Sequence, residues 1–415
     1  MVPDTRHDLP EQTEESLDQP LLEGIRILDL SRMLAGPYGS LLLADMGAEV
    51  LKIEDPGVGD KTRTGFPLLY EGESIYFLSL NRNKKSLTLN MKDARGRDLF
   101  AQLVKQADVV YDNMRPDALK RLGADYETLR QLNPRIISCS VTGFGHTGPY
   151  RDHPAFDLIV QGMGGAMSYT GPIDGEPVKM GLPMGDLAAG MFGALAVCAA
   201  LFRRERSGYG QRIDISMLDG QMSLHTYIGG SWLLAQDIAR PFGSAHQYMV
   251  PYQAFKTADS YIVVVTSVEE RFWANFCRAV GLEELAEEPR FLTNQQRGAH
   301  RDELIPLLEE RFLAKTSEEW LARLNEADVP CGPVNTIDRA FQEPQVLARN
   351  MVVDVPHPRS GTVMKVIGNP IKVSAQKTER FVCAPSLGEH TESILTSLLG
   401  YSAEQVAALR REGVV

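Results

Sequence analysis

Short apolar runs alternate with amphipathic stretches over the first part of the chain. Residues 24–30 (GIRILDL) are rich in β-branched side chains and predict a buried strand; 31–48 have helical spacing, and 49–55 (EVLKIED) again predict a strand. Two helix–strand pairs follow over 93–113 and 125–143. Strands that alternate with helices in this way are typical of a parallel sheet covered on both faces. The pattern therefore predicts an α/β fold with a Rossmann-like domain.

The pattern changes in the later part of the chain. Residues 246–267 predict an antiparallel hairpin, and helices rich in Glu and Arg follow it. We therefore expect a smaller α+β domain over 225–330, inserted between two parts of the large domain, 21–224 and 331–415. The acidic, proline-punctuated residues 1–20 predict a flexible tail.

Composition and charge narrow the classes of function. The chain has 415 residues and a formal net charge of −11, which argues against a nucleic-acid partner. Its five cysteines are scattered and never form Cys-x-x-Cys, so we expect reduced thiols and neither disulfides nor a metal site. The N-terminus lacks the pattern of a signal or transit peptide. The most apolar window, Met191–Phe202, is shorter than a membrane span and predicts a buried helix. We expect a cytoplasmic protein without a membrane partner.

One carboxylate stands where a glycine-rich loop becomes a long apolar helix. Asp186 follows Gly185 and precedes a run of small residues that ends in Arg203. Aspartate at such a position commonly caps the helix. A carboxylate beside a glycine-lined pocket can also be a covalent nucleophile. Capping is the more common role, and the residues alone leave both interpretations open.

A glycine motif between 143 and 148 does not indicate a dinucleotide cofactor. Gly143-x-Gly145-x-x-Gly148 follows a predicted strand, but Pro149 comes directly after it and Pro154 five residues later. No helix can begin there to bind a pyrophosphate, so the motif fails in its context.

Several longer motifs occur together, in order, between Leu22 and His390. They are 22–54, 74–92, 108–123, 138–165, 185–190, 204–220, 329–334 and 387–391. With these motifs the chain resembles the family III (CaiB/BaiF) CoA-transferases, which include formyl-CoA and carnitine CoA-transferases. The resemblance implies an interlocked homodimer with acyl-CoA and a carboxylic acid as substrates and no tightly bound cofactor or metal.

The resemblance also assigns a role to Asp186, the nucleophile of the family's Gly-Asp motif. It implies that this carboxylate attacks the acyl-CoA thioester and forms a mixed anhydride. The CoA thiolate then attacks back, giving an aspartyl-CoA thioester, and the acceptor acid reverses these steps. Backbone N–H groups of the glycine loops would stabilise the oxyanions.

Other family positions imply contacts with CoA. They fall on Ala35, Leu89, Lys92, Asn113 and Arg121. Cationic side chains suit phosphate groups, although Lys92 and Arg121 can equally be solvated surface charges.

Differences from the family members narrow the expected reaction. A racemase or epimerase would have a histidine before Asp157, where this chain has Phe156, so one of two proton-transfer groups is missing. Oxalate-directed transferases have a glutamine at the position of Leu34 and a glycine-rich flap, whereas 243–253 lacks a glycine run. Both differences disfavour these activities.

The motifs 31–37, 81–86, 245–257 and 343–347 most resemble the succinyl-CoA:dicarboxylate branch. We therefore expect CoA transfer from succinyl-CoA to a dicarboxylic acid, with Leu34 and Arg32 as substrate contacts. Arg32 follows the first strand, where open α/β sheets bind ligands, and would pair with the distal carboxylate. A salt bridge within the sheet is the alternative for Arg32. A racemase or epimerase and a non-catalytic acyl-CoA binding protein remain the alternative functions.

Overall fold

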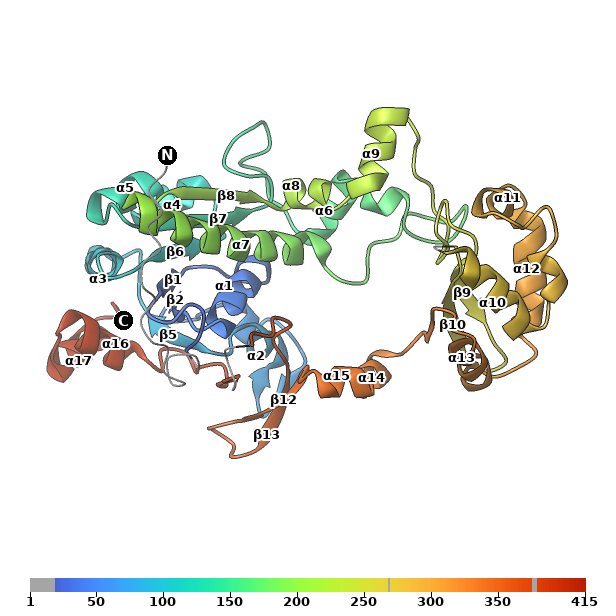
Figure 1. Cartoon of the computed structure of the whole chain (residues 1–415). Helices are drawn as coiled ribbons and strands as arrows, with labels where there is room; N and C mark the ends of the chain where they lie inside the picture. The colour runs from blue at the N-terminus through green and yellow to red at the C-terminus, as the bar shows by residue number, and fades with distance from the viewer. Residues whose placement is uncertain (1–18, 268, 375–378) are drawn as a thin grey trace, which may run out of the picture. The chain divides into compact units, whose positions relative to one another are not determined.

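A computed structural model describes residues 19–267, 269–374 and 379–415. The described chain divides into two compact units (Figure 1). The large unit contains 19–164, 181–224 and 345–415, and the small unit contains 165–180 and 225–344. All but the last two residues of the expected N-terminal tail lie outside the described residues.

A six-stranded parallel sheet forms the centre of the large unit, with strand order β5-β2-β1-β6-β7-β8. Its strands are β1 (Arg26–Asp29), β2 (Glu49–Glu54), β5 (Lys84–Thr88), β6 (Val109–Asp112), β7 (Ile137–Thr142) and β8 (Arg212–Ser216). The predicted α/β fold with a parallel sheet is confirmed.

Helices cover both faces of this sheet because the inner strands are apolar on both sides. Ile27 packs on one face with α1, α6, α7 and α8, and Leu28 packs on the other with α3, α4, α5, α16 and α17. The first set is α1 (Ala35–Asp45), α6 (Asp157–Met163), α7 (Met184–Ser207) and α8 (Met217–Ser223). The second set is α3 (Ala94–Val104), α4 (Pro116–Leu122), α5 (Tyr126–Leu132), α16 (Thr391–Leu399) and α17 (Ala403–Arg411).

Small residues let α1 and α7 cross closely on the first face. A Cβ atom on Gly190 would lie 2.6 Å from the carbonyl oxygen of Ala35, and one on Gly193 would lie 2.2 Å from the Tyr111 hydroxyl. Neither position has room for a side chain. The close crossing brings the N-terminal turn of α7 toward the start of α1.

The helix α7 is long and apolar enough to cross a membrane, a test that the core helices of soluble proteins also pass, and half of its most apolar window is buried. The sequence predicted a buried helix here. Only one face meets that prediction, because Met191, Leu195 and Phe202 on the other face are exposed.

Shorter elements complete the large unit. They are β3 (Leu69–Tyr70), β4 (Glu73–Ser74), α2 (Ile75–Leu80), β12 (Val352–Pro356) and β13 (Val363–Ile367). The β12–β13 hairpin contributes Val355 and Met364 to an apolar cluster with Phe77 and Leu78 of α2.

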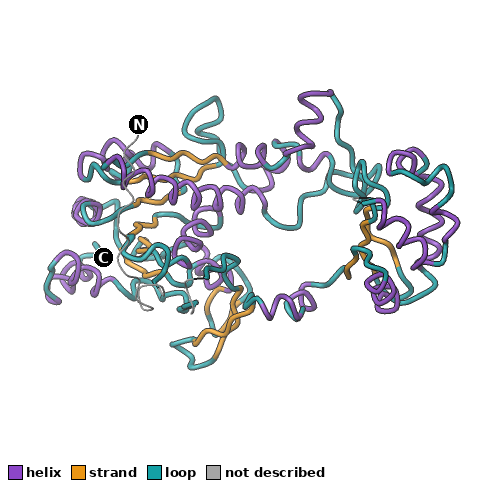
Figure 2. The backbone as a smooth tube through the Cα atoms, viewed as in Figure 1, coloured by secondary structure: helices purple, strands orange, loops and turns teal. Residues whose placement is uncertain are grey.

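The small unit consists mostly of helices around a three-stranded antiparallel sheet (Figure 2). Its strands are β9 (Tyr252–Lys256), β10 (Tyr261–Val265) and β11 (Cys331–Pro333). Its helices are α9 (Thr226–Ala235), α10 (Glu270–Val280), α11 (Asn294–Ala299), α12 (Arg301–Phe312), α13 (Ser317–Glu326) and α14 (Ile337–Ala340), and α15 (Pro344–Ala348) leads back to the large unit. Its core is built around Trp273, Phe276 and Trp320.

The bounds of the small unit differ from the expected 225–330. The unit extends to Pro344: β11 (Cys331–Pro333) pairs with β10, and α14 follows in the same unit. It also includes 165–180, which the sequence pattern placed in the large domain.

Candidate active site

A cavity of about 650 Å³ lies where strands of the central sheet end. Leu30 follows β1, Asp55 follows β2, Leu89 follows β5 and Asn113 follows β6, and all four line it. Ligands of open parallel sheets bind at this carboxyl edge. The cavity is therefore where the fold itself predicts a binding site.

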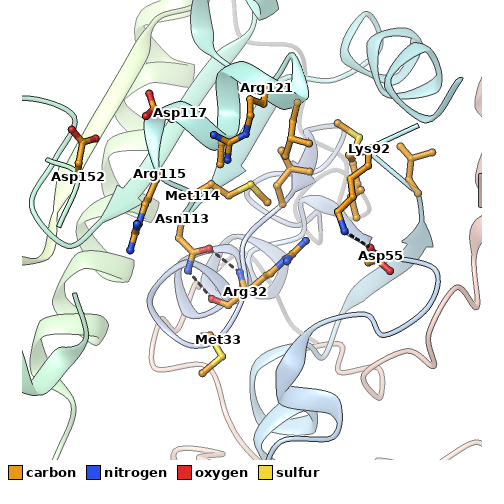
Figure 3. Close-up of a pocket in the computed structure, with 16 residues that line it drawn as sticks. Arg32, Met33, Asp55, Lys92, Asn113, Met114, Arg115, Asp117, Arg121 and Asp152 are labelled. Atoms are coloured by element: carbon orange, nitrogen blue, oxygen red, sulfur yellow. Dashed lines mark hydrogen bonds and ion pairs between the residues drawn. The ribbon is translucent and has the colours of Figure 1, made fainter. Parts of the chain in front are cut away.

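Charged side chains of both signs line this cavity: the cations of Arg32, Lys92, Arg115 and Arg121, and the carboxylates of Asp55, Asp117 and Asp152. Arg32 comes from the turn after β1, Lys92 from the loop after β5 and Arg121 from the last turn of α4 (Figure 3). All three are exposed, and Lys92 approaches Asp55 only at 3.9 Å. Long, exposed cations can follow the phosphates of a nucleotide. The structure thus brings Leu89, Lys92, Arg121 and Arg32 together, as a common ligand would require.

Asn113 supports the turn that carries Arg32. Its side-chain oxygen accepts a hydrogen bond from the Arg32 backbone N–H at 2.9 Å, and its side-chain nitrogen donates to the Arg32 carbonyl at 2.6 Å (Figure 3). Both polar ends of the amide are therefore occupied by the protein backbone.

A second cavity, of about 300 Å³, adjoins the first. The two share Met33, Asn113 and Arg115 in their walls. The second is also lined by Leu34, Ala35, Tyr76, Phe156 and Asp186. All the candidate site residues thus line one or both of two adjoining cavities of the large unit.

Asp186 lies in the first turn of α7, but another carboxylate caps that helix. Asp157, the first residue of α6, accepts hydrogen bonds from the backbone N–H groups of Gly185 at 2.8 Å and Asp186 at 3.4 Å. Gln161 holds the other Asp157 oxygen at 2.6 Å. Within the described residues, the Asp186 carboxylate makes no hydrogen bond or ion pair. The capping interpretation of Asp186 is therefore replaced by capping through Asp157.

The surroundings of Asp186 make its carboxylate unusually basic. Partial burial and then the negative charge of Asp157 raise the pKa of Asp186 to about 7. Burial, followed by the charges of Asp186 and Asp60, raises the pKa of Tyr76 to about 12. A partly buried carboxylate that titrates near neutrality is typical of a reactive group.

Asp157 and Tyr76 were not among the residues chosen from the sequence. The pair Phe156-Asp157 was used only as evidence against a racemase, because Phe156 stands where a histidine would be required. Tyr76 lies in an apolar run, which gave no sign of a functional role. Their relation to Asp186 arises from the packing of α6, α7 and α2 around one cavity, and no sequence spacing encodes it. In the described part of the chain, no group of three or more His, Cys, Asp or Glu side chains is placed to hold a metal ion.

The fold is therefore an α/β fold with a large cavity at the carboxyl edge of its parallel sheet. Beside this cavity lies Asp186, a carboxylate with a raised pKa. Comparison with known proteins identifies the class: the model of CoA-transferase family III matches residues 22–391, and the chain belongs to this family. The protein is therefore a CoA-transferase, whose substrates are a CoA thioester and a carboxylic acid.

Individual relatives are similar over nearly their whole length. The chain is 40% identical to succinyl-CoA:glutarate CoA-transferase of Mus musculus, over 95% of this chain and 90% of the relative. It is also 40% identical to acetyl-CoA:oxalate CoA-transferase of Acetobacter aceti, over 85% and 89%. A crystal structure of a CAIB/BAIF family protein from Brucella suis superposes with a TM-score of 0.81 at 37% identity, covering 91% of this chain and 99% of that one.

Proposed function

We propose that the protein transfers CoA from succinyl-CoA to a dicarboxylic acid, such as glutarate, through covalent intermediates on Asp186. One observation carries the proposal. The Asp186 carboxylate, whose pKa is raised and which does not cap its helix, lies in a cavity that adjoins the larger cavity with Arg32, Lys92 and Arg121. The similarity to a succinyl-CoA:glutarate transferase supports the choice of substrates.

In this proposal the two cavities bind different parts of the acyl-CoA substrate. CoA occupies the larger one, its phosphates near Lys92 and Arg121, and the thioester enters the smaller one. The Asp186 carboxylate attacks the thioester carbonyl and expels CoA thiolate, forming a mixed anhydride. The thiolate attacks the aspartyl carbonyl and releases succinate, leaving an aspartyl-CoA thioester. The acceptor carboxylate then attacks the aspartyl carbonyl of this thioester, which expels CoA thiolate and forms a second mixed anhydride. The thiolate attacks the acyl carbonyl of the acceptor, which gives the new acyl-CoA and frees the Asp186 carboxylate.

The start of α1 supports oxyanion stabilisation in this proposal. The helix begins at Ala35 in the wall of the smaller cavity. The first N–H groups of a helix have no partner within it and lie at the positive end of its dipole. Residue 37 is proline and the Tyr38 N–H donates to the Leu34 carbonyl, so the N–H groups of Ala35 and Gly36 are the suitable donors for the oxyanion of each tetrahedral intermediate.

The position of Arg32 favours a contact with CoA over one with the distal carboxylate. Arg32 lines the larger cavity with Lys92 and Arg121 and is absent from the wall that contains Asp186. Leu34 and Ala35 line the smaller cavity and are the better candidates for contact with the acyl chain and the thioester.

We further propose that the protein acts as the interlocked homodimer implied by its family resemblance. In the small unit, α9 is apolar but buries none of its residues. Its Leu233 and Leu234 side chains are 74% and 90% exposed. In the large unit, the exposed face of α7 carries Met191, Leu195 and Phe202. Exposed apolar patches of this kind mark protein interfaces.

Mass spectrometry tests the proposal directly. Wild-type protein incubated with succinyl-CoA alone should gain a covalently attached CoA at Asp186, and Asp186→Asn should gain none. Wild type should then transfer CoA to glutarate in a panel that also contains oxalate and monocarboxylic acids. Transfer confined to monocarboxylic acids would refute the dicarboxylate assignment, and transfer confined to oxalate would refute glutarate as the acceptor. Binding without any adduct would indicate a non-catalytic binder. Deuterium entering the α-carbon of a branched acyl-CoA in D2O would indicate a racemase.

A further inference from the structure

The turn Ser31–Met33 forms a wall of both cavities. Arg32 and Met33 line the larger cavity, and Met33 and Leu34 line the smaller one. Met33 has a φ of 67°, in the left-handed region that is unfavourable for a residue with a side chain. The turn therefore needs contacts that hold it in this conformation.

Buried charged side chains supply those contacts from the interior. The backbone N–H and hydroxyl of Ser31 donate to Asp29 at 2.9 and 2.5 Å, and the Ser31 carbonyl accepts from the Lys52 ammonium at 2.9 Å. The N–H of Met33 donates to the Asp60 carboxylate at 3.5 Å. Each end of the turn is thus bound by an ionised side chain.

These side chains belong to one buried network with three carboxylates and three cations. Its ion pairs are Lys52–Asp60 at 3.0 Å, Lys84–Asp29 at 3.2 Å and Arg63–Glu54 at 2.6 Å. The Lys52–Asp60 pair is 1% exposed on both sides. Burial alone would raise the pKa of Asp60, but the charge of Lys52 lowers it below its usual value. Asp60 therefore stays ionised.

Such a network is weak evidence for stability, because apolar side chains of similar volume can stabilise a core as well as a buried ion pair does. What apolar side chains cannot do is bind the polar backbone groups of the turn. Asp60 also lies close enough to the smaller cavity for its charge to raise the pKa of Tyr76. The network therefore reaches the candidate site, where Lys52 and Asp60 bind the backbone of the Ser31–Met33 turn.

We propose that the Lys52–Asp60 pair positions the Ser31–Met33 turn for binding of the CoA ester. Lys52 and Asp60 are positioning residues: they act through the backbone of the turn, which places Arg32 beside one cavity and Leu34 beside the other. The inference rests on the proposed assignment of the larger cavity to CoA.

A matched pair of double variants tests this proposal. Lys52→Met/Asp60→Asn removes both charges of the pair without leaving either unpaired. Arg82→Met/Asp45→Asn does the same to another buried pair, 2.5 Å apart, at the far end of α1, and neither of its residues lines the two cavities. Calorimetry gives the Kd for CoA, and thermal unfolding gives the Tm.

We expect both double variants to lower Tm, but only Lys52→Met/Asp60→Asn to weaken CoA binding, by about tenfold, because a misplaced wall loses contacts made by the bound ligand. Equal CoA affinity in wild type and both double variants would overturn the proposal. Wild type that does not bind CoA would instead refute the assignment of the cavity, so the two failures are distinguishable.

A single variant, Asp60→Glu, tests the same proposal if Lys52→Met/Asp60→Asn does not fold. It preserves the charge balance but moves the carboxylate by one methylene group relative to the Met33 N–H. We expect a higher KM for the acyl-CoA with kcat retained, whereas Asp45→Glu should leave KM unchanged. An unchanged KM in Asp60→Glu would contradict the positioning role.

Discussion

The two adjoining cavities of the large unit share part of one wall, including Arg115, but each also has charged side chains that the other lacks. The larger is surrounded by Arg32, Lys92 and Arg121, which are long, exposed and supplied by three separate elements. The smaller contains the carboxylate of Asp186, partly buried and beside a second carboxylate, Asp157. The proposed binding charges are thus exposed to solvent, whereas the proposed reactive charge is partly buried in the first turn of a helix.

This difference follows from what each charge does. A cation that binds a phosphate can remain exposed, because its contact forms with the ligand and is lost without harm to the fold. A nucleophile needs a carboxylate oxygen that is not already engaged by hydrogen bonds within the fold. The fold achieves this by giving the cap of α7 to Asp157 and leaving the Asp186 oxygens available.

The largest effect should follow from removing the reactive charge. Asp186→Asn keeps the size of the side chain but abolishes the nucleophile, so we expect kcat to fall by at least about 10⁴-fold. Calorimetry should still detect CoA binding, since the cations are intact. Asp219→Asn, in the first turn of α8, is the matched control and should retain activity. Substantial transfer by Asp186→Asn would disprove covalent catalysis at this residue.

Removing one binding charge should have a smaller effect of another kind. In Arg121→Ala or Lys92→Ala we expect KM for the CoA ester to rise about tenfold, the equivalent of one lost charge-assisted contact, with kcat nearly unchanged. Wild-type KM should also rise with ionic strength, because exposed charges are screened. Arg130→Ala removes an exposed cation of α5 and serves as control. A loss of kcat with constant KM would contradict the division between the cavities.

Arg32→Ala decides between the two assignments of that residue. A contact with CoA predicts a KM increase of several-fold that is the same for succinyl-CoA and for a monocarboxylic acyl-CoA. This size is appropriate for an exposed cation, whose contacts are partly compensated by water. An increase confined to succinyl-CoA would return Arg32 to the distal carboxylate, where the sequence motif first placed it.

Much of the fold could be predicted because its signal is local. The β-branched runs at 24–30 and 49–55 are buried parallel strands, and their spacing from helices predicted the sheet. The end of the small unit was missed because β11 is a three-residue strand, Cys-Gly-Pro, with no periodicity of its own. Its assignment depends on pairing with β10, a contact between segments distant in the sequence.

The site shows the same limit. Asn113 and Arg121 were predicted from family resemblance alone, whereas Asp186 was also a candidate because of its place at the start of a helix. The structure gathers all three at one sheet edge. Asp157 and Asp60 matter through partners in other elements: one caps a helix that begins far along the chain, and the other holds a turn after a different strand. A sequence pattern records neither relation.

The smallest effect should come from the neighbour of the reactive carboxylate. Asp157→Asn keeps an oxygen to accept the α7 N–H groups but removes a negative charge, which should lower the pKa of Asp186 from about 7. In the proposed mechanism the ionised form of Asp186 attacks, so the acidic limb of kcat/KM should move to lower pH. Burial is the larger cause of the raised pKa and persists in the variant, so we expect a shift of less than about one pH unit. The control Asp219→Asn should leave the acidic limb of the kcat/KM profile unchanged. If Asp157→Asn also leaves this limb unchanged, Asp157 acts only as the cap of α7.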